Sequence, residues 1–371
     1  MTIPFNDLGR HYAGMAAELE EASLRVLRGG WYVLGPEVAA FEREWADYCG
    51  ARHCVSLATG TDALQLAVRA LGLGPGDEVL TVANAGSYVA FATRLAGATP
   101  RYADVDLDTW TMDPLDMELA ITPRTKAIVP VHLYGRLADI AEIAAIAERH
   151  GLPLIEDCAQ AHGARLDGRH AGTFGLAGCF SFYPTKNLGA LGDGGAIITD
   201  DDDFAARLRQ LRTYGWEQKY RVTVAGGTNS RLDELQAAIL RVKLRHLDAQ
   251  NQRRAQIAAR YGAGLADLPL RLAAPAAEGS HVHHLYVIQL LSEQRAVIQA
   301  ALRERGIGTD IHYPIADHRQ PAWAAEYADL RLIGAEGLAE SGLSLPCYPE
   351  LTDSEVDEVI AALRAAFSFT S

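Results

Sequence analysis

Short apolar runs alternate with longer segments of helical periodicity along the first two hundred residues. The runs typical of strands cover residues 53–58, 77–83, 99–106, 125–135, 152–160, 181–184 and 194–200. Segments with apolar residues three and four positions apart, typical of helices, lie at 61–71, 87–97 and 138–151. A strand, a helix and another strand in succession form a βαβ unit, and a series of such units builds a mostly parallel sheet. The pattern therefore predicts an α/β fold.

The pattern becomes mainly helical after residue 201. Helices are expected at 202–211 and 232–261, and we expect the longer one to connect two domains. Beyond it, the sequence predicts a small α+β domain from an apolar segment at 281–290, a helix ending at 303–307 and a last helix at 353–367. We place the large domain at 1–250 and the small domain at 251–371.

Composition and charge narrow the choice of partner. The chain has 371 residues, 49% hydrophobic and 22% charged, which suits a globular enzyme with a large core. Its formal net charge of -13 disfavours nucleic acid and anionic membranes, so we expect a small-molecule ligand. The five cysteines lack zinc-type spacing, and we expect free thiols and no metal site. Without a signal-peptide pattern, or an apolar run of the roughly 20 residues of a membrane helix, the sequence indicates a cytoplasmic protein.

One lysine stands apart from other charges. Lys186 lies between a short apolar run and a cluster of glycines in SFYPTKNLGALGDGGAII (181–198). Loss of solvent there would lower the pKa of the amine and leave it reactive. Upstream, the apolar run of LPLIEDCAQAHGA (152–164) ends in Glu156 and Asp157. A carboxylate at the carboxyl end of a parallel strand faces the ligand crevice. We therefore expect an acid of this pair to lie in the same site as Lys186.

A third segment predicts an anion site. In LATGTDALQLA (57–67) a strand leads through Gly60 into a helix with Thr61 as N-cap, which presents amide groups at the positive end of the helix dipole. The Walker pattern is absent and GLGPGDE (72–78) lacks the G-x-G-x-x-G spacing, which disfavours ATP and NAD. An anion site, a buried acid and a reactive lysine together fit pyridoxal 5'-phosphate, which offers each of them one group: phosphate, pyridine nitrogen and aldehyde.

The same segments carry a family resemblance. Over nearly its whole length the chain is similar to the DegT/DnrJ/StrS-type sugar aminotransferases, in PFNDL, GGWYVLGPEVAAFE, TGTDAL, EDCAQAHGA, SFYPTKNLGALGDGG, GTNSRLDELQAA, GIGTDIHYP and SLPCYP. The resemblance implies a fold-type I, aspartate aminotransferase-like architecture. It has a mostly parallel seven-stranded sheet in the large domain and a smaller C-terminal α+β domain. It also implies a homodimer with its active sites shared across the interface.

The resemblance assigns roles to matching positions. Lys186 matches the lysine that forms the Schiff base, Asp157 the partner of the pyridine nitrogen, and Gln160 a contact to the ring hydroxyl. Further cofactor contacts are implied to the phosphate and the pyridine face: Gly60, Thr61 and Ser181, Tyr88 as the stacking aromatic, and Asn229 from the other subunit. From the residues alone, Tyr88 also fits a core position, Ser181 a pair within the sheet, and Asn229 a helix cap.

The resemblance also implies the reaction. Glutamate would give its amino group to the cofactor, with Lys186 moving the proton, and a keto sugar would then receive that amino group. The chain looks closest to enzymes that aminate C3 of dTDP-linked 3-keto-6-deoxyhexoses. The residues expected on the sugar side are Tyr183, Lys219, Tyr220, His312 and Tyr313.

Alternatives remain at this stage. Enzymes that act on C4-keto sugars or keto-inositols share the same cofactor residues, so these residues do not select the substrate. Relatives with a histidine in place of the lysine are sugar dehydratases, and Lys186 favours amino transfer instead. A regulator that binds the cofactor without turnover belongs to another class, and it would have no use for the lysine, acid and glutamine together.

Overall fold

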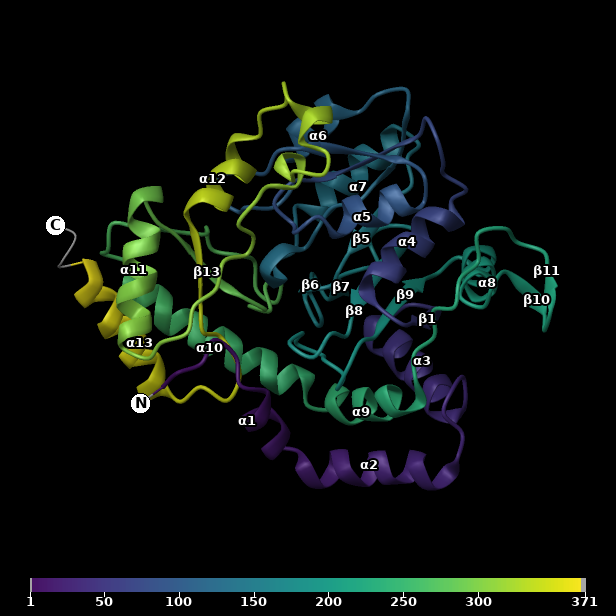
Figure 1. Ribbon diagram of the computed structural model, residues 1–371, viewed down its shortest axis with the longest axis horizontal. Coiled ribbons are helices and arrows are strands. Elements are labelled where there is room, and N and C mark those ends of the chain that lie inside the picture. Colours follow the sequence, from purple (N-terminus) through teal and green to yellow (C-terminus); the bar gives the residue numbers. More distant parts are fainter. Residues whose placement is uncertain (1, 368–371) are drawn as a thin grey trace.

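A seven-stranded sheet forms the centre of the large domain (Figure 1). The computed structural model describes residues 2–367. The strands follow the order β1 (His53–Leu57), β9 (Gly195–Thr199), β8 (Ala177–Ser181), β5 (Ile155–Asp157), β4 (Thr125–Ile128), β2 (Glu78–Val82) and β3 (Thr99–Ala103). Parallel bridges from Ile128 to Leu154 and from Val131 to Asp157 join β4 to β5. Because only β9 in this sheet is antiparallel to its neighbours, the predicted fold is confirmed.

Helices cover both faces of the sheet. One core packs against α4 (Gly60–Ala70), α5 (Tyr88–Leu95) and α7 (Ile140–Arg149), and a second packs against α3 (Pro36–Cys49) and α9 (Glu234–Leu244). In α7 the buried residues Ile140, Ile143 and Ala147 have the spacing of one helical face, which is why this segment folds as a helix on the sheet. The remaining elements here are α6 (Pro114–Ala120), α8 (Asp202–Leu211), β6 (Arg165–Leu166), β7 (Arg169–His170), β10 (Trp216–Gln218) and β11 (Arg221–Val222).

A third core lies at the other end of the molecule. It includes residues of α10 (Leu247–Leu265), α11 (Ser292–Glu304) and α13 (Asp353–Phe367). They pack on a three-stranded sheet of β12 (Arg271–Leu272), β13 (Tyr286–Gln289) and β14 (Gly342–Leu345), with α12 (Ile333–Ser341) beside it. Ile3 belongs to this core and pairs with Ile307, so the N-terminal segment crosses to the C-terminal part of the chain before α1 (Leu8–Ala13) and α2 (Ala16–Gly29) begin.

Two sequence expectations need correction. The helix expected at 232–261 is two helices, α9 and α10, separated by a turn at Arg245 and His246. The turn lets α9 pack on α2 and α3 while α10 packs on α13, and apolar periodicity alone does not reveal this change of partner. The strand expected at 181–184 lies earlier, at 177–181, because the chain turns after Ser181, where Lys186 N donates to Tyr183 O (2.8 Å).

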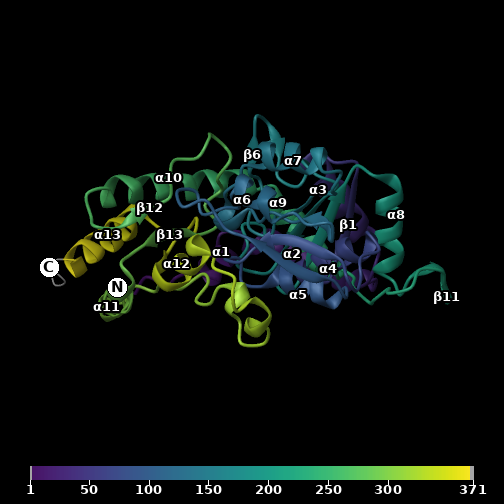
Figure 2. The ribbon, with the colours of Figure 1, turned by 90° about the horizontal axis from the view of Figure 1, so that it is seen from above.

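The predicted domain boundary at 250/251 lies inside α10, and the division stays a prediction. The β10–β11 hairpin lies at the end of the molecule opposite α11 and α13 (Figures 1 and 2). Among residues 2–367, no helix is both long and apolar enough to cross a membrane.

Candidate active site

A cavity of about 560 Å³ opens at the edge of the sheet where β1, β5 and β8 end. Because these three strands run in one direction, the residues that follow them meet at this edge. The structure brings most of the expected site residues to its walls: Gly60, Thr61, Tyr88, Asp157, Gln160, Ser181, Tyr183, Lys186, His312 and Tyr313. Residues more than 250 positions apart in the chain therefore form one site.

Lys186 lies on the cavity wall in the turn between β8 and β9. The protein around its ammonium group lowers the pKa of Lys186 to about 8, and the negative charge of Asp157 opposes part of this shift. A lysine with this pKa is partly unprotonated near neutral pH, whereas an ordinary lysine is almost wholly charged. The side chain is therefore a usable nucleophile and base at this edge of the sheet.

Asp157 ends β5 and is only 4% exposed. Its Oδ1 accepts a hydrogen bond from Ala159 N (3.0 Å), and its backbone pairs with Pro130 and His132 of the neighbouring strand connection. Burial raises the pKa of Asp157, while Lys186 acts to lower it. A cation placed against this carboxylate would be stabilised strongly, since little water competes for the charge.

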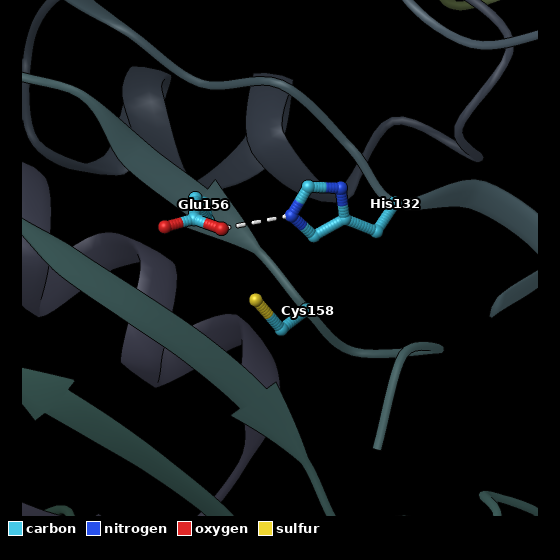
Figure 3. Close-up of side chains that lie close together, drawn as sticks. All are labelled: His132, Glu156 and Cys158. Atoms are coloured by element: carbon cyan, nitrogen blue, oxygen red, sulfur yellow. Dashed lines mark hydrogen bonds and ion pairs between the residues drawn. The ribbon is translucent and has the colours of Figure 1, made fainter. Parts of the chain in front are cut away.

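The adjacent Glu156 has a different role, because successive side chains of a strand point to opposite faces and its carboxylate meets His132 (Figure 3). Its carboxylate accepts hydrogen bonds from the backbone N–H groups of Gly172, Phe174 and Gly175 (2.6–3.0 Å). His132 Nε2 donates to it as well (3.0 Å), since Ala138 N donates to His132 Nδ1 (3.1 Å) and fixes the tautomer.

These contacts make the cluster of His132, Glu156 and Cys158 a structural anchor. Its three potential ligand atoms lie within 4.8 Å of one another, as in a metal site. However, both ring nitrogens and both carboxylate oxygens already have hydrogen-bond partners, and burial raises the pKa of the Cys158 thiol well above its usual value. The cluster therefore ties the end of β5 to the 172–175 loop and to the segment after β4.

The first turn of α4 forms another wall. Thr59, and not Thr61 as expected, is the N-cap: its Oγ1 accepts from Asp62 N (2.9 Å), and the helix begins at Gly60. Both threonines suit a cap in the sequence, and the helix start decides between them. Thr61 instead lies in the first turn and lines the cavity. A Cβ on Gly60 would lie 2.5 Å from Ser181 Cβ, so glycine is what lets the helix start approach the end of β8.

Aromatic side chains form a further wall of the cavity. The ring of Tyr88 is 46% exposed, which excludes a core position, and its edge meets Tyr313 with ring centres 6.2 Å apart. Gln160 Nε2 donates to the Tyr313 hydroxyl (3.1 Å), and Gln160 Oε1 accepts from Tyr134 N (2.6 Å). The amide of Gln160 is thereby fixed beside the cavity.

His312 and four unexpected polar residues also line the cavity. His312 Nδ1 pairs with Ser344 Oγ (2.9 Å), and its ring stacks on Phe5. Sequence reasoning missed Thr59, Thr185, Asp193 and His284. Thr185 and Asp193 lie in the same glycine-rich segment as Lys186, which is a usable signal. No sequence signal points to His284, because it belongs to the HVHH segment and reaches the cavity only when the chain has folded.

Three expected site residues lie outside the cavity of this chain. Lys219 and Tyr220 belong to the β10–β11 hairpin, which projects from the body of the protein (Figure 2). The ammonium group of Lys219 lies 5.1 Å from the Tyr220 ring centre, and Tyr220 is 78% exposed. Asn229 pairs with Thr213 at the base of this hairpin. The expected contacts of Lys219 and Tyr220 with the sugar, and of Asn229 with the cofactor of another subunit, stay predictions.

Comparison with known proteins identifies the family. Residues 14–364 match the DegT/DnrJ/EryC1/StrS aminotransferase family. The chain belongs to this family. It is 48% identical, over 98% of its length and 95% of the relative, to dTDP-3-amino-3,4,6-trideoxy-alpha-D-glucose transaminase of Streptomyces venezuelae.

Solved structures agree with this assignment. DesV of S. venezuelae in complex with a ketimine intermediate has a TM-score of 0.95, at 47% identity over 98% of each chain. NtdA of Bacillus subtilis with bound cofactor PMP has a TM-score of 0.93, at 35% identity over 99% of this chain and 85% of the other.

The cofactor is pyridoxal 5'-phosphate, and the residues of the cavity fit it. Gly60 and Thr61 at the start of α4 line the cavity beside Ser181, and the amide groups of a helix start suit a phosphate. Asp157 suits a protonated pyridine nitrogen, Tyr88 suits the ring face, and Lys186 suits the aldehyde. The chain is a sugar transaminase that depends on this cofactor.

Proposed function

We propose that this enzyme moves the amino group of glutamate to C3 of a dTDP-linked 3-keto-6-deoxy sugar in the biosynthesis of an amino sugar. One observation supports amino transfer most directly. Lys186, with its pKa of about 8, lies in one cavity with Asp157 and the start of α4. The similarity to a dTDP-3-amino-sugar transaminase at 48% identity supports the acceptor.

The residues divide the work. Bound in the cavity, pyridoxal phosphate supplies an aldehyde that joins amines covalently and a ring that withdraws electrons from the neighbouring carbon. Asp157 keeps a proton on the ring nitrogen, and Thr61 and Ser181 hold the phosphate. Lys186 would act as base toward the α-carbon proton of the amino donor and, in the second half-reaction, as acid toward the sugar carbon that receives the amino group. Tyr183, His312 and Tyr313 line the same cavity and would contact the sugar.

We propose further that two subunits share each active site. Large apolar side chains are exposed near the end of α2 and on α5: Leu27 (54%), Trp31 (61%), Tyr32 (53%), Phe91 (46%) and Leu95 (57%). A contiguous apolar patch on a surface marks an interface, and these side chains are the candidates for one. In such a dimer, the hairpin of one subunit brings Lys219, Tyr220 and Asn229 to the cavity of the other.

Mixing two inactive variants tests the shared site. Lys186→Ala and Asn229→Asp should each be inactive or nearly so alone. After unfolding and refolding together they should regain activity, because a mixed dimer holds one site with both native residues. Sedimentation should give twice the mass of one chain. A monomeric active enzyme, or mixtures without recovery, would show that each subunit works alone.

The half-reactions test the proposed reaction. Glutamate should convert the absorbance of the bound aldehyde form to that of the amine form, and dTDP-3-keto-6-deoxyglucose should restore it. A panel that adds a dTDP-4-keto sugar and a keto-inositol, with the product position read by NMR, decides between C3 and the alternatives. If glutamate converts the aldehyde form to the amine form but no keto sugar restores the aldehyde form, the proposed acceptor is contradicted. We place this reaction in the cytoplasm, where the five cysteines, all free and buried, would stay reduced.

A further inference from the structure

A second chamber of about 270 Å³ opens beside the cofactor cavity. It shares Tyr183, Thr185, His284 and His312 with that cavity, so the two spaces adjoin. Its other walls come from the first residues of the chain and from its C-terminal part: Phe5, Asn6, Leu285, Asp310, Leu345 and Cys347. The pairing of Ile3 with Ile307 and of Asp310 with Ser344 holds these segments together. The chamber is therefore a fixed extension of the active site on the side of the C-terminal domain.

The chamber has an apolar side and an acceptor side. Phe5 and Leu345 supply the apolar surface, and Phe5 stacks on His312 with ring centres 5.6 Å apart. Asp310 supplies a carboxylate whose Oδ1 accepts from Ile311 N (2.8 Å). Its other oxygen lies 3.9 Å from His312 Nε2, too far for a direct hydrogen bond, and the Asp310 side chain is 61% exposed. The carboxylate thus retains acceptor capacity toward a ligand.

The charge of the chamber selects between the two substrates. Among residues 2–367, no Lys or Arg lines the chamber, and Lys186 is the only one that lines the cofactor cavity. Burial lowers the pKa of His312, which keeps that ring neutral beside Asp310. Glutamate carries two carboxylates, and the carboxylate of Asp310 would repel either of them. A deoxy sugar is instead neutral at the ring, with hydroxyl donors for Asp310 and a methyl group for the apolar side.

We propose that Asp310 is a specificity-determining residue that accepts a hydrogen bond from a hydroxyl group of the sugar ring held in this chamber. The inference rests on the proposed function, which it deepens by naming where the sugar is recognised. Neither the sequence pattern nor the cofactor residues point to Asp310, since the chamber exists only after residues 5–6, 310 and 345 have folded together.

Separate half-reactions of the full-length, cofactor-loaded enzyme test this role. In Asp310→Ala, kcat/KM for dTDP-3-keto-6-deoxyglucose should fall about 10- to 100-fold, the value of a hydrogen bond to a charged group. In Asp310→Asn, which keeps the shape and the contact to Ile311 N, the fall should be smaller. The rate of the glutamate half-reaction should stay within about twofold of the wild type in both variants. The control is Asp329→Asn, because Asp329 is an exposed carboxylate that lines neither the cofactor cavity nor the chamber.

Each remaining outcome overturns the inference. Equal sugar kinetics in wild type and both Asp310 variants would refute it while the proposed function stands. A loss confined to the glutamate half-reaction would show that the chamber holds the donor. Wild-type enzyme that reacts with glutamate but not with the dTDP sugar would overturn the proposed acceptor and this inference together. Circular dichroism and thermal unfolding of each variant separate a local effect from misfolding.

Discussion

Replacing Gly60 with alanine should weaken cofactor binding without unfolding the protein. A Cβ at this position would lie 2.5 Å from Ser181 Cβ and 2.9 Å from Ser181 Cα. Carbon atoms in contact lie about 3.5–4.0 Å apart, so the start of α4 and the end of β8 must separate by about 1 Å. A phosphate held by both then loses hydrogen-bond distance to one of them, since these bonds weaken beyond about 3.2 Å.

The size of the effect follows from the hydrogen bond that is lost. A hydrogen bond to a charged group is worth about 1.5–3 kcal/mol, so the apparent Kd for pyridoxal phosphate should rise about 10- to 100-fold. Titration of the apoprotein, followed by absorbance, measures this directly. Gly74→Ala is the matched control, because a Cβ at Gly74 meets no heavy atom within 4 Å. An unchanged Kd in a folded Gly60→Ala protein would refute the account of the phosphate site.

Three other results are expected. Asp157→Asn should slow the glutamate-driven absorbance change roughly 100-fold or more, since an amide does not stabilise charge on the ring nitrogen; a near-normal rate would contradict its role. The rate of cofactor capture by apoprotein should rise about tenfold per pH unit below the Lys186 pKa of about 8 and level off above it, because only the unprotonated amine attacks; a plateau starting near pH 10, as for free lysine, would argue against a lowered pKa. Glu156→Gln should lower the free energy of unfolding in urea by about 2–4 kcal/mol, because an amide N–H would face other donors, while exposed Glu304→Gln should have little effect.

The sequence predicted that Lys186 and Asp157 lie at one edge of the sheet, where the structure places both, for a physical reason. Lys186 and Asp157 each follow an apolar run, and strand ends in a parallel sheet converge. The prediction of Thr61 as the N-cap was wrong, because Thr59 and Thr61 flank the same glycine and only the helix start decides between them. The sequence also showed no sign of the break between α9 and α10, since each helix keeps its own apolar face while the partner changes.

Features formed by segments that lie far apart in the chain could not be predicted from the sequence. Glu156 looked like a second candidate acid, and only the strand alternation and the 172–175 loop show that its carboxylate is an anchor. The chamber of Asp310 joins the first residues of the chain to its C-terminal part. Asn229 was expected to reach the cofactor of another subunit, and the structure places Lys219, Tyr220 and Asn229 away from the cavity of their own chain.

The most direct test of the central claim is borohydride reduction of the cofactor-loaded enzyme, followed by peptide mass spectrometry. The chain has four lysines, Lys126, Lys186, Lys219 and Lys243. Burial lowers the pKa of Lys243 to about 8 as well, but Lys243 lies in α9 and lines neither the cavity nor the chamber. The account predicts the cofactor on Lys186 alone. Label on Lys243, or Lys186 left unmodified in loaded enzyme, would contradict it.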